Sequence, residues 1–422
     1  MLFLYNIGIR IYYCLVWAAS LYNQKAKNWI QGRKKWASLI APEFKHSKNA
    51  WFHFASLGEF EQGKPLIQKF KDNCPEYKII FTFFSPSGYE NLKNSPLADL
   101  VLYLPLDTKR NAEKFLEALN PEIVFVTKYE YWYHFFTELK KRGISLYIVS
   151  AIFRPNQIFF KFYGGFSRQI LKCVTHFFVQ NHTSSQLLES IHLKNVSIVG
   201  DTRFDSVTDN LKNVKPFPII SDFCEDKPIL IAGSTWLKDE FLLAKLLPFF
   251  PEWKLIIAPH EIGEKRIHQI QELFPNAIRY SEIATNSSPN KAQKINANQH
   301  QTLIVDNIGM LSSLYKYGHI AYIGGGFGVG IHNTLEAATF GLPILFGPKY
   351  QKFQEAKDLV KIQSGFSISN FGEMIELFKK LSGNKIYREQ AGNKAKVYVE
   401  RHIGASQKII DFVKNLKPFN NV

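Results

Sequence analysis

Short apolar runs alternate with amphipathic stretches along most of the chain after residue 50. In the first half, the apolar runs are 51–56, 78–84, 99–105, 122–128, 145–151, 176–180 and 196–200. Segments with helical periodicity lie between them, at 60–72, 87–94, 108–119, 132–142 and 183–191. Because strands that alternate with helices form parallel sheets covered by helices, this half is expected to be an α/β domain.

A second series of the same kind follows a polar interruption. Residues 206–227 are polar, contain Pro216 and Pro218 and break the periodicity, so we expect a linker there. We expect one α/β domain over 25–205, a second over 228–402 with a ligand cleft between the two, and a C-terminal helix over 403–422 that packs back on the first domain. The apolar runs of the second series are 228–234, 254–260, 302–306, 319–326 and 342–347.

The first 24 residues are apolar and aromatic, with Arg10 as their single charge. Their length is at the short end for a membrane span, and no clear cleavage site for a signal peptide follows. We expect a membrane-associated segment that either crosses the bilayer or lies on it, with the rest of the chain in the cytoplasm. The alternative is a first buried helix of a soluble domain. The basic residues that follow are Lys25, Lys27, Arg33, Lys34, Lys35, Lys45 and Lys48.

Composition narrows the class of protein. The chain has 422 residues, of which 46% are hydrophobic and 21% charged, so it is neither disordered nor fibrous. Its net charge of +16 favours a polyanionic partner: nucleic acid, an anionic membrane or a phosphorylated substrate. The basic residues are spread along the chain without a nucleic-acid reading motif, so nucleic acid is not expected as a partner.

Metal and disulfide chemistry are not indicated by the sequence. Four cysteines stand far apart, and neither an Asp-x-Asp triplet nor an HExxH motif occurs. We therefore expect no bound metal and no other cofactor.

The first candidate for chemistry is the segment 55–59, Ala-Ser-Leu-Gly-Glu, directly after a predicted strand. Open α/β sheets bind ligands at such strand ends. Gly58 permits a tight turn or the close approach of a ligand, and Ser56 lies beside it. Glu59 is a candidate general base for a hydroxyl group. The alternative is a first-turn glutamate that complements the helix dipole.

The second candidate is the glycine-rich segment 324–336, between a strand and a helix. Such a loop can hold phosphate through backbone N–H groups. It is neither a Walker A motif nor a dinucleotide fingerprint, because no Gly-Lys-Ser/Thr follows and the order of glycines differs. Glu336, one turn into the helix, is placed to bind a ribose diol. The alternative is a loop that serves only tight packing.

Two shorter segments end predicted strands of the second domain. Ser234 and Thr235 follow Gly233 and either cap a helix or bind phosphate. His260 follows Pro259, and a single histidine in such a place is more often structural than catalytic.

Taken together, these motifs resemble the Kdo (3-deoxy-D-manno-oct-2-ulosonic acid) transferases of lipopolysaccharide synthesis. The resemblance extends from the N-terminal apolar segment to about Arg401. It implies a GT-B-type fold, with two Rossmann-like domains and a cleft between them, preceded by an N-terminal membrane-associated helix. The segments that carry it, in order, are WFHFASLGEFEQGKPLI, FTFFSPSGYE, VTKYEYW, GDTRFD, IAGSTW, IAPH, DNIGML and GGGFGVGIHNTLEAATFGLPILFGPKYQKFQEA.

The resemblance also implies a reaction and a set of residues. The donor is CMP-Kdo, the acceptor is a lipid A precursor of the lipid IVA type, and the transfer inverts the anomeric centre without a metal. Glu59 matches the general base, while Glu130 and Arg203 match positions that support the transition state. The location implied is the cytoplasmic face of the inner membrane. The positions that match donor-binding segments are Ser234, Thr235, Pro259, His260, Gly309, Met310, Leu311, Gly326, His332, Asn333, Thr334, Leu335 and Glu336; Ser56 and Gly58 lie on the acceptor side.

This chain departs from the family pattern at several of these positions. His260 stands where an arginine is usual, which puts its phosphate contact in doubt. Met310 replaces a common glutamate, Thr334 a proline, and Arg203 a lysine, so the geometry of the donor contacts is in question. Two other functions stay open at this point: a GT-B transferase or epimerase that uses another nucleotide sugar, such as a UDP-sugar, and a non-enzymatic protein that binds membrane surfaces.

Overall fold

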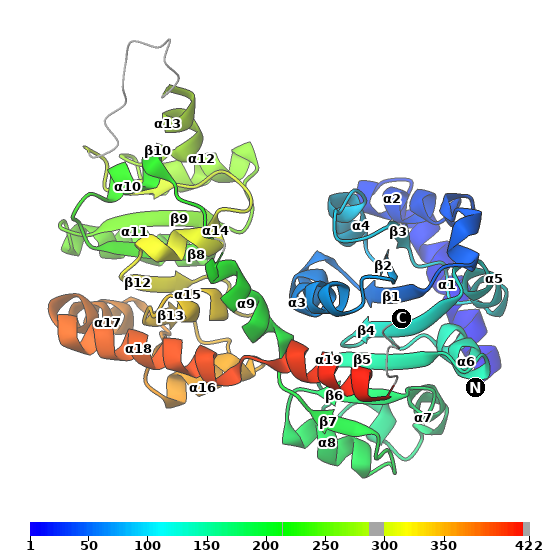
Figure 1. The fold of residues 1–422 in the computed structure, drawn as a ribbon. Coiled ribbons are helices and arrows are strands. Elements are labelled where there is room, and N and C mark those ends of the chain that lie inside the picture. Colours follow the sequence, from blue (N-terminus) through cyan, green and yellow to red (C-terminus); the bar gives the residue numbers. More distant parts are fainter. Residues whose placement is uncertain (213, 287–298, 417–422) are drawn as a thin grey trace. The chain divides into compact units, whose positions relative to one another are not determined.

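The computed structural model describes residues 1–212, 214–286 and 299–416, and the chain forms two compact units (Figure 1). Unit 1 consists of residues 1–206 and 403–422, of which 417–422 lie outside the described part. Unit 2 consists of residues 207–402. Each unit contains a parallel sheet of seven strands, as the alternating pattern of the sequence predicts.

The sheet of unit 1 has the order β3-β2-β1-β4-β5-β6-β7, and all its neighbours are parallel. All seven strands expected in this half of the chain are present. Their bounds are β1 (Asn49–Phe54), β2 (Lys78–Phe83), β3 (Leu100–Tyr103), β4 (Pro121–Thr127), β5 (Ser145–Ala151), β6 (His176–Val179) and β7 (Val196–Ile198).

Helices connect and cover these strands. The α-helices of unit 1 are α1 (Leu2–Ala19), α2 (Gln24–Gly32), α3 (Leu57–Asn73), α4 (Pro86–Leu92), α5 (Lys109–Leu119), α6 (Tyr133–Lys141), α7 (Gly165–Leu171), α8 (His182–Glu189) and α19 (Ala405–Leu416), and α9 (Thr202–Lys212) begins in it. The short 3₁₀ helices are η1 (Trp36–Leu39), η2 (Pro42–Lys45) and η3 (Ile158–Phe160).

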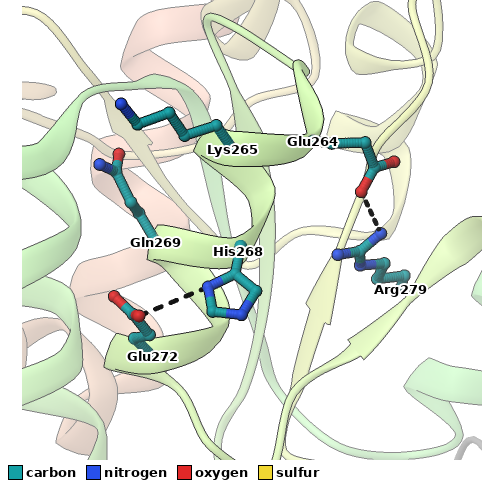
Figure 2. A pocket seen from close by; sticks show the side chains of 6 residues that line it. All are labelled: Glu264, Lys265, His268, Gln269, Glu272 and Arg279. Carbon is teal, nitrogen blue, oxygen red and sulfur yellow. Dashed lines mark hydrogen bonds and ion pairs between the residues drawn. The ribbon is translucent and has the colours of Figure 1, made fainter.

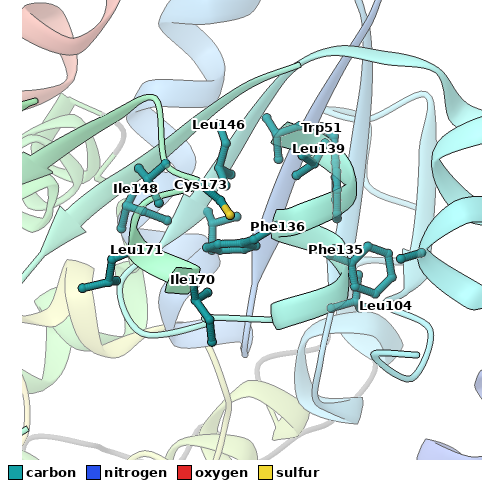
Figure 3. Close-up of a cluster of buried hydrophobic side chains, with 14 of the residues drawn as sticks. Trp51, Leu104, Phe135, Phe136, Leu139, Leu146, Ile148, Ile170, Leu171 and Cys173 are labelled. Atoms are coloured by element: carbon teal, nitrogen blue, oxygen red, sulfur yellow. The ribbon is translucent and has the colours of Figure 1, made fainter. Parts of the chain in front are cut away.

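Aromatic side chains fill both faces of this sheet. Successive residues of a strand point to opposite faces, and Trp51 accordingly belongs to one buried cluster while Phe52 belongs to another. The Trp51 cluster packs under α5, α6 and α7 (Figure 3). The Phe52 ring stacks on Phe125 of β4 at 4.8 Å between ring centroids. Because both faces are covered, the strands read as continuous apolar runs rather than alternating ones.

The C-terminal helix α19 belongs to unit 1, where it packs against α3. Ile409, Ile410 and Val413 of α19 enter the same buried cluster as Phe52. The carboxylate of Asp205 accepts the backbone N–H groups of Gly404 and Ser406, at 2.5 and 2.7 Å, and so caps the start of the helix.

The sheet of unit 2 has the order β10-β11-β9-β8-β12-β13-β14 and is also parallel. Two of its strands, β10 and β14, are absent from the sequence-based expectation because each is short and holds a single large apolar residue, so neither forms an apolar run. The bounds are β8 (Ile229–Thr235), β9 (Lys254–Pro259), β10 (Ile278–Arg279), β11 (Thr302–Ile304), β12 (Ile320–Ile323), β13 (Ile344–Phe346) and β14 (Gly365–Ser367).

The expected linker 206–227 is not irregular throughout, since it contains the end of α9 and the whole of α10. Residue 213 within it lies outside the described part. The helices of unit 2 are α10 (Pro218–Cys224), α11 (Leu237–Leu246), η4 (Leu247–Phe249), α12 (Glu264–Leu273), α13 (Tyr280–Asn286), α14 (Leu311–Leu314), η6 (Tyr315–Tyr317), α15 (Leu335–Thr339), α16 (Gln354–Lys361), α17 (Phe371–Gly383) and α18 (Lys385–His402).

Candidate active site

Both sheets reverse their strand order at one place, and these places carry the candidate residues. In unit 1 the reversal lies between β1 and β4, and in unit 2 between β8 and β12. Ligands of open α/β sheets bind outside the carboxyl ends of the strands at such points. Glu59 and Glu130 follow β1 and β4, while Thr235 and Gly324 lie at the ends of β8 and β12.

Glu59 lies in the first turn of α3, which begins after Ser56. One of its carboxylate oxygens accepts the backbone N–H of Ala55 at 2.6 Å, so the side chain folds back over the end of β1. Burial raises the pKa of Glu59; the Ala55 N–H opposes this rise, the negative charge of Glu130 adds to it, and Lys128 and His53 oppose it. The structure therefore brings Glu59 and Glu130 into one electrostatic cluster.

Glu130 accepts a hydrogen bond from one ring and lies close to a second. Its Oε2 accepts the indole N–H of Trp132 at 3.1 Å and lies 3.5 Å from Nε2 of His53. Nδ1 of His53 lies 2.7 Å from the hydroxyl and 3.2 Å from the carbonyl oxygen of Thr82. The same hydroxyl accepts the indole N–H of Trp51. These contacts fix the orientation of the His53 ring beside Glu130.

Lys128 adds a positive charge to this cluster. It directly follows β4 with a φ of 59°, a left-handed conformation that is unfavourable for a residue with a side chain. Strained residues of this kind are concentrated at functional sites. Neither Lys128 nor His53 is among the site residues predicted from the sequence, because a single lysine or histidine carries no spacing signal.

Arg203 lies in the first turn of α9 and is paired with Asp201. Its Nε and Nη2 atoms each lie 2.8 Å from Oδ2 of Asp201. Its positive charge also lowers the pKa of Tyr129, which burial raises, so Arg203 lies near the segment that carries Glu130. The hydroxyl groups of Ser150 and Thr202, 2.8 Å apart, fix the start of α9.

Ser56 and Gly58 leave an open surface beside Glu59. The Ser56 side chain makes no capping hydrogen bond to α3. A Cβ atom at Gly58 would meet nothing closer than the Ser56 Oγ, at 3.9 Å, among the described residues. Gly58 is also helical, so a tight turn does not explain this glycine.

In unit 2 the glycine-rich loop after β12 is shaped by backbone contacts. A Cβ at Gly324 would lie 2.3 Å from the Ser234 carbonyl oxygen, and one at Gly326 would lie 2.6 Å from the backbone of Gly347. Gly325 and Gly330 have φ values of 91° and 146°. Tight packing therefore accounts for much of the glycine content, as the alternative interpretation of the loop requires.

Asp239 and Glu240 of α11 hold this loop and were not expected from the sequence. Asp239 is 1% exposed and accepts the N–H groups of Trp236 and Gly325, both at 2.9 Å, and the Tyr322 hydroxyl at 2.7 Å. Glu240 is fully buried between Arg266 and the Thr235 hydroxyl, which donates to it at 2.8 Å. The side chain of Thr235 therefore points into unit 2.

Three rings are stacked at the carboxyl ends of the strands of unit 2. His260 lies between Trp236 and His332, with ring centroids 4.8 and 4.3 Å away. The indole N–H of Trp236 donates to Nε2 of His332 at 3.0 Å. Burial, and then the charge of His260, lower the pKa of His332 to about 4. His332 is therefore neutral at pH 7, with its proton on Nδ1.

Asn333 and Glu336 are joined at the start of α15. The Asn333 amide donates to Glu336 at 3.0 Å and its oxygen accepts the N–H of Leu335 at the same distance. The hydroxyl of Thr334 is buried and finds no hydrogen-bond partner among the described residues. Leu335 is buried in the packing of unit 2.

The remaining predicted donor residues lie at other ends of strands and helices of unit 2. Pro259 ends β9. Gly309 has a φ of 85° and precedes Met310, which is buried, so the side chain of Met310 is not displayed to a ligand. Leu311 begins α14, and its side chain lies close over Gly233.

A separate pocket of about 500 Å³ lies beside α12 and contains none of the predicted residues (Figure 2). Its charges are largely neutralised by two ion pairs, Glu264 with Arg279 and His268 with Glu272. Among the described residues, no group of three or more His, Cys, Asp or Glu side chains is arranged to hold a metal ion.

Comparisons with known proteins show which proteins the chain resembles. A family model described as 3-deoxy-D-manno-octulosonic-acid transferase (kdotransferase) matches residues 30–206. A 3-deoxy-D-manno-octulosonic acid transferase of Haemophilus influenzae is 25% identical over 379 residues, which cover 86% of each chain. A protein of the same name from Aquifex aeolicus is 26% identical over 347 residues, covering 80% of this chain and 87% of the relative.

Solved structures bear on the fold alone. The UDP-GlcNAc 2-epimerase of Neisseria meningitidis superposes with a TM-score of 0.62 at 18% identity, over 87% of this chain and all of the other. MurG of Acinetobacter baumannii superposes with a TM-score of 0.51 at 14% identity, over 87% and 99%. Both units thus have the expected GT-B-type architecture. Over most of its length the chain is therefore similar to proteins named 3-deoxy-D-manno-octulosonic acid transferases.

Proposed function

We propose that the protein transfers Kdo from CMP-Kdo to a lipid A precursor of the lipid IVA type in lipopolysaccharide core biosynthesis. The observation that carries this proposal is the cluster of Glu59 and Glu130 at the strand-order reversal of unit 1. It occurs in a chain whose relatives are named 3-deoxy-D-manno-octulosonic acid transferases.

Glu59 acts as the general base. Its carboxylate takes the proton of an acceptor hydroxyl as the hydroxyl oxygen forms a bond to the anomeric carbon of Kdo. The bond from that carbon to the CMP phosphate oxygen breaks in the same displacement, and CMP leaves with the electron pair. The raised pKa of Glu59 supports this role, because a base works best when its pKa is near the working pH.

Glu130 and Arg203 support the transition state. Glu130 stabilises the positive character that develops on the sugar, and the hydrogen bond from the Trp132 indole orients its carboxylate. The guanidinium of Arg203 offsets the charge that grows on the departing phosphate. Ser56 and Gly58 leave room for the acceptor beside Glu59.

Unit 2 binds the CMP part of the donor. The strained glycine loop presents backbone N–H groups to the phosphate, and the Asn333–Glu336 pair presents a carboxylate to the ribose diol. His332 offers its Nδ1–H group beside His260. Ser234, Pro259, Gly309 and Gly326 contribute backbone at the same strand ends. We expect that the transfer needs no metal ion and that the enzyme works at the cytoplasmic face of the inner membrane.

The test is transfer by the purified full-length chain in lipid vesicles. CMP-Kdo and a tetraacylated lipid A precursor are supplied with and without EDTA, and the product is identified by mass spectrometry. We expect a lipid that carries one or more Kdo units in both cases. UDP-GlcNAc in place of CMP-Kdo should give no product, and CMP, not UDP, should raise the melting temperature. Transfer from a UDP-sugar alone would contradict the proposal.

A further inference from the structure

We infer that α1 lies in the plane of an anionic bilayer surface, docked along unit 1, and does not cross the bilayer. This mode of attachment rests on the membrane association proposed above, but it is independent of which sugar is transferred. By length and composition α1 is the one helix, among the described residues, that is long and apolar enough to cross a membrane.

The N-terminal end of α1 is tied to unit 1 by polar contacts. The Tyr5 hydroxyl donates to Asp107 at 2.5 Å, and Asn6 lies 2.7 Å from Nε2 of His134. Asp107 is 2% exposed and also accepts the backbone N–H groups of His134 and Phe135 at the start of α6. These partners belong to the folded interior of unit 1.

The next two turns of α1 are held by aromatic contacts. Tyr12 and Tyr13 pack on the ring of Trp29, with centroids 5.7 and 6.4 Å away, and Tyr12 stacks on Phe84. Tyr5 to Tyr13 covers about 12 Å of helix, at 1.5 Å per residue. A helix that crossed the bilayer would have to break these contacts or draw the buried Asp107 carboxylate into hydrocarbon, which is strongly unfavourable.

The other side of α1 is apolar and exposed. Phe3, Leu4, Ile11 and Leu15 are 54–74% exposed, and no residue of the helix is buried. Arg10, the single charge, would lie near the centre of the bilayer in a spanning helix. In a helix that lies flat, its long side chain reaches the lipid headgroups. The helix of 18 residues is about 27 Å long, short of the roughly 30 Å hydrocarbon core.

A second exposed apolar segment, residues 158–163, lies near the start of α1. Phe162 is 94% exposed and Tyr163 60%. The segment leads into α7, whose Phe166 ring lies 5.9 Å from Tyr5. Soluble proteins rarely expose neighbouring apolar patches of this kind unless they bind a membrane or a partner.

The charge around α1 selects an anionic lipid surface over a protein partner. Four exposed lysines lie in and just after α2, the helix that follows α1 in the chain: Lys25, Lys27, Lys34 and Lys35. Arg33 does not belong to this group, contrary to the sequence-based expectation. It is buried over the Trp29 ring, 3.7 Å from its centroid. Exposed lysines beside an apolar helix face are typical of helices that bind anionic headgroups.

The docked helix also adjoins the candidate active site. Tyr12 stacks on Phe84, Phe84 stacks on Trp132 at 5.1 Å, and Trp132 donates to Glu130. A lipid acceptor can therefore present its sugar near Glu130 while its acyl chains stay in the bilayer that α1 contacts.

The first test is the topology of the full-length chain in inner membranes. A short tag with one cysteine is placed before Met1 in a Cys14→Ser background, since the other three cysteines are buried. A membrane-impermeant maleimide should label this tag in inverted vesicles and not in spheroplasts. The control Lys114→Cys, in a separate variant, should show the same labelling pattern. Labelling of the tag in spheroplasts would show that α1 spans the bilayer and would overturn the inference.

The second test is co-sedimentation with vesicles of phosphatidylglycerol and phosphatidylcholine, or of phosphatidylcholine alone. Binding should require the anionic lipid. The affinity of the variant Leu4→Ser/Leu15→Ser for the anionic vesicles should fall by about tenfold or more. The matched variant Phe249→Ser/Ile386→Ser, in exposed positions of unit 2, should bind as the parent does. An unchanged circular dichroism spectrum and melting temperature show that each variant is folded.

Two outcomes of this second test would overturn the inference. They are no vesicle binding by the parent chain, or unchanged binding by the α1 variant. Sugar transfer to a detergent-dispersed acceptor is measured separately, so a failure of the proposed reaction and a failure of this attachment mode are distinguishable.

Discussion

The two units place carboxylates at the same point of the same kind of sheet and treat them in opposite ways. In unit 1, Glu59 and Glu130 are only partly buried and close enough for one to raise the pKa of the other. In unit 2, Asp239 and Glu240 are at most 1% exposed, and each is held by several donors. The difference teaches that carboxylates at corresponding points of two similar sheets can stay accessible to a ligand, as in unit 1, or be buried and bonded within the fold, as in unit 2.

The largest expected effect is that of Glu59→Gln. Gln keeps the shape and the contact with the Ala55 N–H but cannot take a proton, so transfer should fall by about 10²–10⁴-fold. CMP affinity and the native fold should be retained. The control is Glu61→Gln, an exposed position two residues further along α3. Product formation at the parental rate would remove Glu59 from the role of base.

Asp239→Ala tests the other half of the comparison. It leaves the Tyr322 hydroxyl and the Gly325 and Trp236 N–H groups without their acceptor, so the free energy of unfolding should fall by about 2–3 kcal/mol. CMP affinity should fall with it, because the glycine loop loses a support. Chemical denaturation measures the first effect and calorimetry the second. Asp222→Ala, at an exposed position of α10, should leave both quantities unchanged.

The charged neighbours of Glu59 should shift the pH dependence of transfer in opposite directions. Burial raises its pKa, so activity should be lost, as pH falls, at a higher pH than for an exposed glutamate. Lys128→Met removes a charge that lowers this pKa and should move the acid limb to higher pH. Glu130→Gln removes a charge that raises it and should move the acid limb of the residual activity to lower pH. If the acid limbs of both variants moved in the same direction, the electrostatic influence of Lys128 and Glu130 on Glu59 would be contradicted.

The same raised pKa has a consequence for stability. Because the folded protein holds the Glu59 proton more tightly than the unfolded chain, this group supports folding below its unfolded pKa. That support is lost as pH rises through the higher folded value. The change in melting temperature caused by Glu59→Gln should therefore be slightly more positive at pH 7 than near pH 4. Thermal unfolding at the two pH values measures the difference, and an equal shift at both would argue against a raised pKa.

The smallest expected effect is that of Trp236→Phe in unit 2. Phe keeps a ring over His260 but loses the N–H donated to His332, so CMP affinity should fall by no more than about tenfold, or about 1 kcal/mol. Trp236→Leu removes the ring as well and should cost more. Equal affinities of the two variants, measured by calorimetry, would show that the ring stack has no role.

The sequence predicts the fold better than it predicts the site. Long apolar runs such as 145–151 are visible because strands buried on both faces are continuously apolar, while β10 and β14 each hold a single large apolar residue and leave no such run. Glu59 is a candidate from its place after a predicted strand, whereas Glu130 was found through the family resemblance. His53, Lys128 and Asp239 escaped notice because their roles come from neighbours 29 to 86 residues away in the chain or from backbone strain.

The motif residues also do not all face a ligand. Thr235 stands in a motif that suggests a phosphate contact, but its hydroxyl is used by Glu240 inside unit 2. Met310 is buried as well, so only its backbone remains for a donor. A sequence motif reports that a position matters, whereas the direction of its side chain is decided by packing that the motif does not encode.

The C-terminal helix imposes an order of events on biosynthesis. Residues 1–206 leave the ribosome first, but the apolar surface that receives Ile409, Ile410 and Val413 stays uncovered until residues 207–402 have been made. At roughly 5–20 residues per second, this wait is on the order of 10–40 s. The nascent chain thus exposes an apolar surface, to which chaperones can bind, while nearly half of its residues are being synthesised. A premature stop codon just after residue 402 would damage the unit that was translated first.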